Sequence, residues 1–298
     1  MPSTVEIDRS VAVSLSGTRD YYHDVTRQYG RYSRQARGWH YGVWDEGVTN
    51  HVQSLYRSNE LLVDGLLIDA DTHILDAGCG TGGFAIWAAK KFACKVTGIT
   101  LVPAHVEQAT TLADAQGVGH LCDFMVAEMD HLPFADGSFD LVTNQDSYCH
   151  AVDKADYLAG VFNVLRPGGV WQAIDFSVQD APLDGAEVDD YRQVLEGFQI
   201  PSMISPQAVA KLLELSGFEE VLCRDITEHV LPSARYIQNM CRWPGRAMRW
   251  GLDWTFFGLS ARGRRNRQGH VLAADAYSRG LLAGYFRHGH YRARKPAA

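Results

Sequence analysis

The segment from Leu75 to Gly83, with the sequence LDAGCGTGG, constrains the fold of this chain more than any other feature. A short apolar run ends in it, and a helical pattern from Phe84 to Lys91 begins directly after it. Glycine permits tight turns and lets a ligand touch the backbone, so a strand, a glycine-rich turn and a helix in this order are typical of ligand-binding α/β proteins. In such proteins the ligand lies at the carboxyl ends of parallel strands. We therefore expect this loop to hold a ligand at one edge of a sheet.

Strand-like and helix-like segments alternate around this loop. The predicted strands are 73–75, 95–99, 123–126, 139–143, 170–176, 219–226 and 291–294. The predicted helices are 50–67, 84–91, 104–115, 155–165, 186–196, 205–215 and 273–286. This alternation predicts an α/β fold with a doubly wound, mostly parallel seven-stranded sheet, which is a Rossmann-like architecture.

Three regions follow from this pattern. Residues 1–68 are expected to form an N-terminal arm and helical cover, of which 1–17 is the mobile arm. Residues 69–180 are expected to form the cofactor-binding core, and residues 181–298 the substrate-side helices, a helical insertion and the last strands. A chain of 298 residues is long enough for one α/β domain with such insertions.

Composition and charge narrow the class of protein. The formal net charge of −7 argues against a nucleic-acid partner, because nucleic-acid binding relies on cationic side chains that neutralise phosphates. The six cysteines include no CxxC pair, so we predict neither a zinc site nor a disulfide framework. No apolar stretch approaches the roughly 18 residues of a membrane span, and Met1 to Ser16 lacks the pattern of a signal peptide. We expect a soluble, cytoplasmic protein.

The acidic residue two positions before the first glycine of the loop indicates the charge of the ligand. A carboxylate at Asp76 would repel a pyrophosphate but suits a cationic group. After the second predicted strand, where dinucleotide enzymes carry a ribose-binding carboxylate, this chain has Thr100 and Leu101. After the third strand, Glu128 can accept a hydrogen bond from an adenine amino group, and Met129 can cover the ring. These residues favour a cationic ligand with an adenine ring.

Three segments in fixed order carry a family resemblance: DAGCGTG at 76–82, LPFADGSFD at 132–140 and LRPGG at 165–169. Together they resemble class I S-adenosylmethionine-dependent methyltransferases, and the resemblance implies S-adenosylmethionine as cofactor. The aromatic ring of Tyr21 can attract the cofactor's positive charge. The expected cofactor-binding residues are Asp76, Gly78, Gly80, Thr100, Leu101, Glu128, Met129, Gln145 and Tyr21.

Two further segments refine the resemblance. The sequence GITL at 98–101 and the sequence HYGVW at 40–44 resemble the group of tocopherol C-methyltransferases, cyclopropane fatty acid synthases and sterol C-methyltransferases. This likeness implies that Thr100 and the amide of Leu101 hold the ribose hydroxyls, although the group usually has Gln where this chain has His105. The segment QDSYCHA at 145–151 is also similar to glycine and sarcosine N-methyltransferases, so it does not select one chemistry.

Three residues are candidates for the catalytic chemistry. His150 follows the fourth predicted strand, and the ordinary pKa of histidine suits a general base; the alternative is an imidazole that only orders its loop. Asp146 either acts on the substrate or bonds neighbouring amides. Tyr22 either covers the reacting sulfonium or belongs to a packed amphipathic helix. Both interpretations of each residue remain open at this point.

Candidate substrate contacts come from two regions. His40 and Trp44 either line the site or belong to the core. Arg265 lies in the arginine run RGRRNR at 262–267 and, with Trp243, suits a ligand with an anionic head and an apolar tail. The alternative for this run, which we favour from the sequence, is a solvated surface loop beside a packed helix.

These observations predict an S-adenosylmethionine-dependent methyltransferase that acts on a small-molecule acceptor. The main hypothesis is C-methylation of a hydrophobic, prenyl or terpenoid-like acceptor in biosynthesis, because the finer resemblance and the aromatic-rich C-terminal region favour it. N-methylation of a small amine is the second hypothesis, and a non-catalytic cofactor-binding protein is the third. A homo-oligomer is compatible with the sequence.

Overall fold

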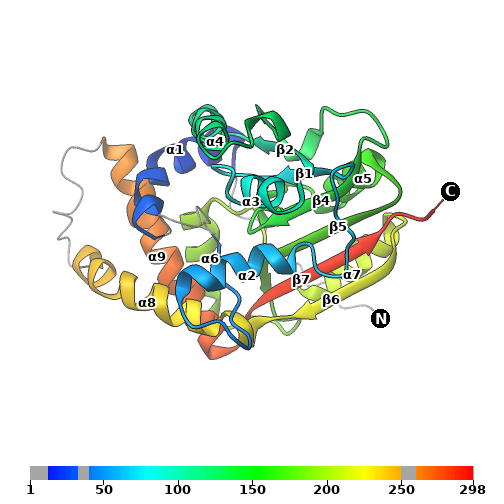
Figure 1. Ribbon diagram of the computed structural model, residues 1–298. Coiled ribbons are helices and arrows are strands. Elements are labelled where there is room, and N and C mark those ends of the chain that lie inside the picture. Colours follow the sequence, from blue (N-terminus) through cyan, green and yellow to red (C-terminus); the bar gives the residue numbers. More distant parts are fainter. Residues whose placement is uncertain (1–12, 33–39, 250–259, 298) are drawn as a thin grey trace.

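A sheet of seven strands lies at the centre of the molecule (Figure 1). The computed structural model describes residues 13–32, 40–249 and 260–297, and the side chains of these residues except 27–32 and 242–249. The strands are β1 (His73–Ala77), β2 (Lys95–Thr100), β3 (Cys122–Val126), β4 (Phe139–Gln145), β5 (Leu165–Val178), β6 (Glu219–Asp225) and β7 (Phe286–Arg294). Their order across the sheet is β3-β2-β1-β4-β5-β7-β6.

The sheet is mostly parallel. Strands β1 to β5 run in one direction, and β7 runs antiparallel to both β5 and β6. The prediction of a doubly wound, mostly parallel seven-stranded sheet is therefore confirmed. One detail differs, because β5 begins at Leu165 and so includes the Pro-Gly-Gly turn that was expected to precede it, and its register with β4 shifts between Phe139 and Leu141.

Helices surround the sheet and cover one of its ends. They are α1 (Leu15–Tyr32), α2 (His51–Leu61), α3 (Gly83–Phe92), α4 (Pro103–Ala115), α5 (Lys154–Val164), α6 (Gly185–Phe198), α7 (Pro206–Leu215), α8 (Thr227–Arg249) and α9 (Ala261–Ala283). Short 3-10 turns are η1 (Gly119–Leu121), η2 (Met129–His131) and η3 (Tyr148–His150).

Two apolar clusters explain why helices pack on both faces of the sheet. Side chains of successive strand residues point to opposite faces, and both faces of β1 are apolar. Ile74 packs in the cluster that includes residues of α2, α3 and α4, whereas Leu75 packs in the cluster that includes residues of α5 and α7. Both side chains are fully buried. A strand that is apolar on both faces fits only a sheet covered on both sides.

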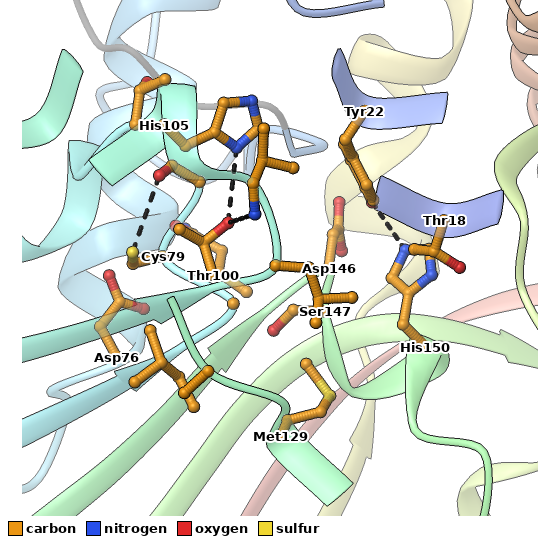
Figure 2. Close-up of a pocket in the computed structure, with 18 of the residues that line it drawn as sticks. Thr18, Tyr22, Asp76, Cys79, Thr100, His105, Met129, Asp146, Ser147 and His150 are labelled. Carbon is orange, nitrogen blue, oxygen red and sulfur yellow. Dashed lines mark hydrogen bonds between the residues drawn. The ribbon is translucent and has the colours of Figure 1, made fainter. Parts of the chain in front are cut away.

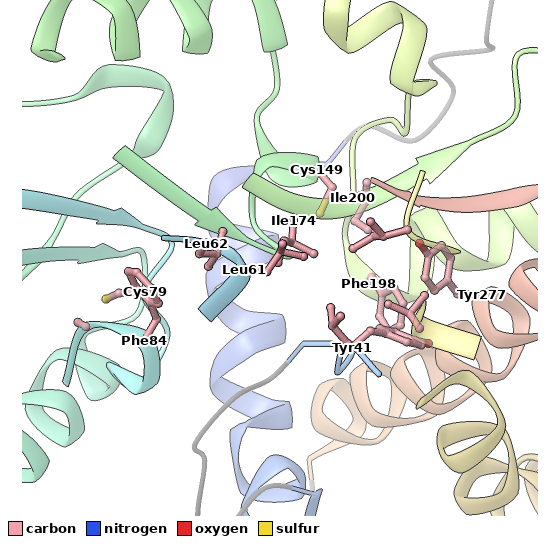
Figure 3. Close-up of a cluster of buried hydrophobic side chains, with 14 of the residues drawn as sticks. Tyr41, Leu61, Leu62, Cys79, Phe84, Cys149, Ile174, Phe198, Ile200 and Tyr277 are labelled. Carbon is pink, nitrogen blue, oxygen red and sulfur yellow. The ribbon is translucent and has the colours of Figure 1, made fainter. Parts of the chain in front are cut away.

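The helices α1, α8 and α9 gather beyond one end of the sheet, and α6 packs against α9 (Figure 1). The larger apolar cluster connects these helices with the sheet, as Figure 3 shows. Phe198 and Tyr277 lie on the side of these helices, whereas Leu62 and Phe84 lie on the side of β1 and α3. The covering helices and the sheet therefore share one core.

The arginine run at 262–267 is helical. Helix α9 begins at Ala261, and the Ser260 hydroxyl caps it by accepting from the Gly263 amide at 3.0 Å. The interpretation of this run as a surface loop is therefore wrong. Arg262 pairs with Asp20 at 2.7 Å and with Asp24 at 3.1 Å, so this part of α9 holds α1.

The N-terminal region also differs in extent from the expectation. Helix α2 ends at Leu61, several residues before the expected end at 67. Of the predicted arm 1–17, residues 1–12 lie outside the described residues, and α1 already begins at Leu15. No helix in the described part of the chain is both long and apolar enough to cross a membrane.

Candidate functional site

A pocket lies where β1, β2 and β4 end, under the N-terminal half of α1 (Figure 2). Its walls come from the glycine-rich loop after β1, from the end of β2, from the segment after β3 and from the loop after β4. Figure 2 shows Asp76, Cys79 and Thr100 on one side of this pocket and Tyr22 and His150 on the other, with Asp146 between them. This pocket thus connects the glycine-rich loop, which was expected to bind a ligand, to the candidate acid–base residues.

The glycine-rich loop is tied to the loop after β4. The Ser147 hydroxyl and the side-chain amide of Asn144 both donate to the carbonyl of Ala77, at 2.6 and 2.9 Å. Gly78 has φ +89°, and a Cβ atom there would lie 2.5 Å from the Cβ of Ser147. Only glycine allows this backbone conformation and this close approach together. The two loops that shape the pocket therefore hold each other in place.

Asp76 presents a buried carboxylate to the pocket. Its side chain is 3% exposed, and Oδ2 has no hydrogen-bond partner among the described residues. Burial raises the pKa of Asp76 to about 7. The hydroxyl of Thr81, which also lines the pocket, likewise has no partner among the described residues. A buried carboxylate oxygen of this kind needs a donor, so this end of the pocket fits a ligand that carries a cationic N–H group.

At the end of β2, His105 connects Thr100 to helix α1. Its Nε2 lies 2.8 Å from the Thr26 hydroxyl, and its Nδ1 lies 3.5 Å from the Thr100 hydroxyl. The Thr26 hydroxyl donates to the carbonyl of Tyr22, so it accepts from Nε2–H of His105. Burial lowers the pKa of His105 to about 4. His105 thus joins the floor of the pocket to its cover.

The backbone of the loop after β4 is fixed by a second buried carboxylate, that of Asp175. Its Oδ2 accepts from the amides of Ser147, at 2.9 Å, and Cys149, at 3.3 Å. Asp146 adopts φ +49° there, a strained conformation for a non-glycine residue that is typical of functional sites. Its Oδ2 accepts from the Tyr41 amide at 3.0 Å, and its Oδ1 lies 3.3 Å from Nε2 of the buried His288. Asp146 therefore does bond a neighbouring amide and also lines the pocket.

Tyr22 and His150 form a hydrogen-bonded pair at the other side of the pocket. The Tyr22 hydroxyl lies 2.7 Å from Nε2 of His150, and the carbonyl of Gln199 lies 3.1 Å from Nδ1. A carbonyl only accepts, so Nδ1 carries the proton, and Nε2 of the neutral ring accepts from Tyr22. Burial lowers the pKa of His150 to about 4, so the neutral ring is the form present near pH 7. Tyr22 and His150 both line the pocket, so a ligand there can meet this pair.

The pocket also has apolar walls near solvent. Leu15 and Val152 both line it, and they are 41% and 57% exposed. Met129 also lines the pocket (Figure 2). Exposed apolar side chains that line a pocket mark a binding surface for an apolar ligand.

Most of the predicted site residues line this pocket. Those that do are His150, Asp146, Tyr22, Asp76, Gly78, Gly80, Thr100, Leu101, Met129, Gln145 and His40. His40 is buried, and burial lowers its pKa. Its Nδ1 donates to the carbonyl of Tyr41 at 3.1 Å.

Five predicted site residues lie elsewhere or outside the description. Tyr21 is buried under α9, where its hydroxyl lies 2.7 Å from Nδ1 of His270. Trp44 donates to the Ser233 hydroxyl of α8 at 2.9 Å. Glu128 is not among the residues that line the pocket, and its Oε2 lies 3.7 Å from Nδ1 of His131. Arg265 is exposed on α9. The side chain of Trp243 lies outside the described residues.

Sequence reasoning missed several lining residues. Thr18 lies in no motif, Ser147 lies in the segment QDSYCHA without having been assigned a role there, and Asp130 was passed over beside Glu128. The carboxylate of Asp130 accepts from the Val152 amide at 3.2 Å, which links η2 to the opening of the pocket. The signal for Asp130 was its place in the segment after β3. Among the described residues, no cluster of His, Cys, Asp and Glu has the arrangement of a metal site.

Comparison with known proteins agrees with this geometry. Residues 74–169 match the family model described as a methyltransferase domain. The chain is 30% identical over 218 residues to the chloroplastic tocopherol O-methyltransferase of Arabidopsis thaliana, a match that covers 70% of this chain but only 60% of that protein. It is 30% identical to the O-methyltransferase resE of Aspergillus sclerotiorum, with 67% of this chain and 75% of that protein covered. It is 34% identical to the sarcosine/dimethylglycine N-methyltransferase of Halorhodospira halochloris, over 54% of this chain and 56% of that protein.

Two solved structures share the fold over nearly the whole chain. The [4+2]-cyclase SpnF superposes with a TM-score of 0.75 at 22% identity, covering 97% of this chain and 98% of that one. A geranyl diphosphate C-methyltransferase from Streptomyces coelicolor superposes with a TM-score of 0.64 at 20% identity, covering 92% and 98%. Because the glycine-rich loop, the seven-stranded sheet and the relatives in sequence agree, the chain belongs to the class I S-adenosylmethionine-dependent methyltransferase family.

Proposed function

We propose that this protein is an S-adenosylmethionine-dependent methyltransferase that C-methylates a hydrophobic, prenyl or terpenoid-like small molecule. One observation carries the proposal: a single pocket joins the glycine-rich loop, with the unpartnered carboxylate oxygen of Asp76, to the hydrogen-bonded pair Tyr22–His150. Relatives named as methyltransferases of tocopherol and of geranyl diphosphate support the acceptor class.

The residues present fit the cofactor. The buried carboxylate of Asp76 suits the ammonium group of S-adenosylmethionine, Thr100 and the amide of Leu101 suit the ribose hydroxyls, and Met129 suits the adenine ring. When bound, the cofactor supplies an electrophilic methyl group. The chain's own task is to hold the acceptor in line with that methyl group, since proximity and orientation provide much of the rate of a displacement.

The Tyr22–His150 pair suits the removal of a proton after the methyl group has arrived. An alkene or electron-rich ring carbon that gains a methyl group becomes a carbocation, which is so strongly acidic that a weak base can deprotonate it. The proton would pass to the Tyr22 oxygen as the Tyr22 proton passes to Nε2 of His150, so one C–H bond breaks and the neutral imidazole becomes an imidazolium. A histidine whose pKa is about 4 is a weak base of this kind.

The same pair does not suit the activation of an amine. An alkylammonium ion near pH 7 must lose its proton before it can attack, and its pKa lies about 6 units above that of His150, a difference of roughly 8 kcal/mol. The observation that favours N-methylation is different: the carboxylates of Asp130 and Asp146 line the pocket and would attract a cation. N-methylation of a small amine, as named for the Halorhodospira relative, is therefore the second candidate.

A transfer assay with methyl-labelled S-adenosylmethionine separates the candidates. Parallel reactions would contain a prenylated hydroquinone, an acyclic terpenoid alkene, glycine or sarcosine, and the labelled product would be located by NMR. We expect label on carbon in an apolar product. Label only on the amines would reverse the order of the two candidates, and cofactor binding without label in any product would support a non-catalytic cofactor-binding protein.

We also propose that the protein acts in the cytoplasm, because all six of its cysteines are free thiols, which suits a reducing compartment. Fractionation of the native source with an antibody against the chain tests this location, and recovery in a membrane or organelle fraction would contradict it.

A further inference from the structure

A buried lysine, Lys154, contacts the residues on either side of His150. It is the first residue of α5, its side chain is 7% exposed, and its Nζ donates three hydrogen bonds. The acceptors are the carbonyls of Cys149, at 3.3 Å, and Ala151, at 3.2 Å, and the hydroxyl of Ser202, at 3.2 Å. All three protons of the ammonium group are thus used. Among the described residues, Nζ forms no ion pair with a carboxylate.

This position is costly for a lysine. Burying a cation without a paired carboxylate is unfavourable, and the first turn of a helix carries a partial positive charge that repels it. The Asp153 side chain, which caps α5 by accepting from the amides of Ala155 and Asp156, provides negative charge nearby. A smaller apolar or polar residue would avoid the burial cost, so the ammonium group at this position requires another explanation.

The partners of Lys154 supply that explanation. Cys149 and Ala151 are the residues on either side of His150, so their carbonyls fix the turn that carries the imidazole. Ser202 follows Gln199 in the segment after α6, and the Gln199 carbonyl accepts from Nδ1 of His150. Lys154 and His150 therefore bridge the same two segments, one through its side-chain ammonium and one through its ring.

We propose that Lys154 is a positioning residue for His150: its ammonium holds the turn and the segment after α6 around the imidazole, and its positive charge adds to the effect of burial by opposing an imidazolium. The inference deepens the proposed function, since it rests on His150 as the final proton acceptor. It assigns to Lys154 no contact with the cofactor or the acceptor, because Lys154 does not line the pocket.

The charged and polar groups around the ring agree with this role. Tyr22 faces His150 from α1, the Gln199 carbonyl from the end of α6, Asp146 from the loop after β4 and Lys154 from α5. Burial is the main cause of the low pKa of His150, Lys154 lowers it further, and Asp146 and the Gln199 carbonyl raise it. Burial lowers the pKa of Lys154, and the nearby carboxylates of Asp130, Asp153 and Asp175 act against this effect.

The test compares Lys154→Met, which removes the charge and the donors, with Lys154→Arg, which keeps the charge. Lys211→Met, at an exposed lysine of α7, is the matched control. The first readout is the pKa of His150 from an NMR titration without cofactor, with the resonance assigned through His150→Gln. The second is kcat at saturating cofactor. We expect Lys154→Met to raise the pKa of His150 and to lower kcat by about tenfold, since misplacing a reacting group by about 1 Å is costly.

We expect Lys154→Arg to keep the low pKa of His150 even where its different shape lowers kcat, and Lys211→Met to change neither quantity. An unchanged pKa of His150 in Lys154→Met would overturn the inference. If Lys154→Met does not fold, Ser202→Ala decides instead: it removes one acceptor, keeps the charge and should lower kcat by a few-fold without a change in pKa, and an unchanged kcat would then overturn the inference. Failure of the proposed function is distinguishable, because the pKa of His150 is measured without any methyl transfer.

Discussion

The Tyr22 hydroxyl donates a 2.7 Å hydrogen bond to Nε2 of His150, across 128 residues of sequence and from a covering helix to a loop at the sheet edge. The Gln199 carbonyl fixes the proton of the ring on Nδ1, so the pair has a single direction for proton transfer, from Tyr22 to His150. Because α1 brings Tyr22, the chemistry depends on the docking of this helix. The ion pairs of Arg262 with Asp20 and Asp24 contribute to that docking.

The first prediction concerns this pair. Tyr22→Phe removes the hydroxyl that relays the proton, so we expect kcat to fall by about 10- to 100-fold while the affinity for S-adenosylhomocysteine stays within twofold. The double variant Tyr22→Phe/His150→Gln should be little slower than the slower single variant, since residues of one relay are not additive. Tyr285→Phe is the control, because it also loses a hydroxyl hydrogen bond, to Asp190 at 2.6 Å, but outside the pocket. If the losses of kcat from the two substitutions were additive, Tyr22 and His150 would act independently, which would contradict a shared relay.

The second prediction is the pH dependence of kcat. His150 must be neutral to accept a proton, and burial lowers its pKa to about 4. At saturating cofactor we expect kcat to be level from about pH 5.5 to 8 and to fall as the pH drops through the pKa near 4. Brief assays in a mixed buffer, with residual activity checked at pH 7, provide the profile. A decline centred near 6.5, the ordinary pKa of histidine, would contradict a buried neutral base.

The strands and the glycine-rich loop were predictable because their signals are local. An apolar run such as Ile74 to Leu75, a loop with four glycines and the periodic helices between strands each lie within about 15 consecutive residues. The positions of Asp76 and Thr100 at the site followed from the topology alone, since parallel strands place their carboxyl ends at one edge.

Features that depend on distant partners were not predictable in this way. The first turns of α9 contain the arginine run and little apolar periodicity, and its helical state is accompanied by pairing with Asp20 and Asp24, about 240 residues earlier in sequence. Lys154 carries no local signal of its role, because its three acceptors come from residues brought together only by the folded loops. His288, beneath Asp146, is likewise a strand residue whose partner is 142 positions away, a separation that no local pattern encodes.

The third prediction concerns Asp76 and the cofactor. The carboxyl has a pKa of about 7, so part of it is protonated below neutral pH, whereas a cationic ligand binds the carboxylate better. The affinity for S-adenosylhomocysteine should therefore rise as the pH increases from 5.5 to 7.5, and binding at pH 6 should release a proton. Calorimetry in two buffers of different ionisation enthalpy measures both effects. The Asp76→Asn variant should bind S-adenosylhomocysteine at least about tenfold more weakly at pH 7.5, and this affinity should no longer depend on pH. An unchanged affinity would contradict the assignment of Asp76 to the cofactor site.

The fourth prediction separates backbone strain from contact at the glycine-rich loop. Gly78→Ala and Gly137→Ala both place a side chain at positive φ, +89° and +67°, which costs about 1–2 kcal/mol in each case. At Gly137 nothing lies within 4 Å of the new Cβ, whereas at Gly78 it would lie 2.5 Å from Ser147. We expect both variants to lose thermal stability, but only Gly78→Ala to lose cofactor affinity, by at least about tenfold. If calorimetry gave the same cofactor affinity for Gly78→Ala and Gly137→Ala, the contact with Ser147 would not shape the binding loop.

The fifth prediction is that the protein loses stability between pH 6.5 and 4. Five histidines have a folded-state pKa lowered by burial to about 4: His51, His105, His150, His270 and His290. In the unfolded chain they take up protons near pH 6.5, so unfolding binds protons and their contribution to stability is lost as the pH falls. Asp76 and Asp175 act in the opposite direction, because a folded-state pKa of about 7 makes the folded state bind protons that the unfolded chain binds only near 3.8.

The histidines outnumber the two aspartates, so the balance favours unfolding in acid. We expect the Tm from calorimetry to fall from pH 6.5 to 4.5, and His290→Gln to flatten this dependence while lowering the Tm at pH 7, because its Nε2 lies 3.1 Å from the buried Gln172 amide. His120→Gln, at an exposed position of η1, should leave the dependence unchanged. A Tm that rises as the pH falls over this range would mean that the buried carboxyls dominate the proton balance, and the assignment of neutral buried histidines, including the His150 base, would then be wrong.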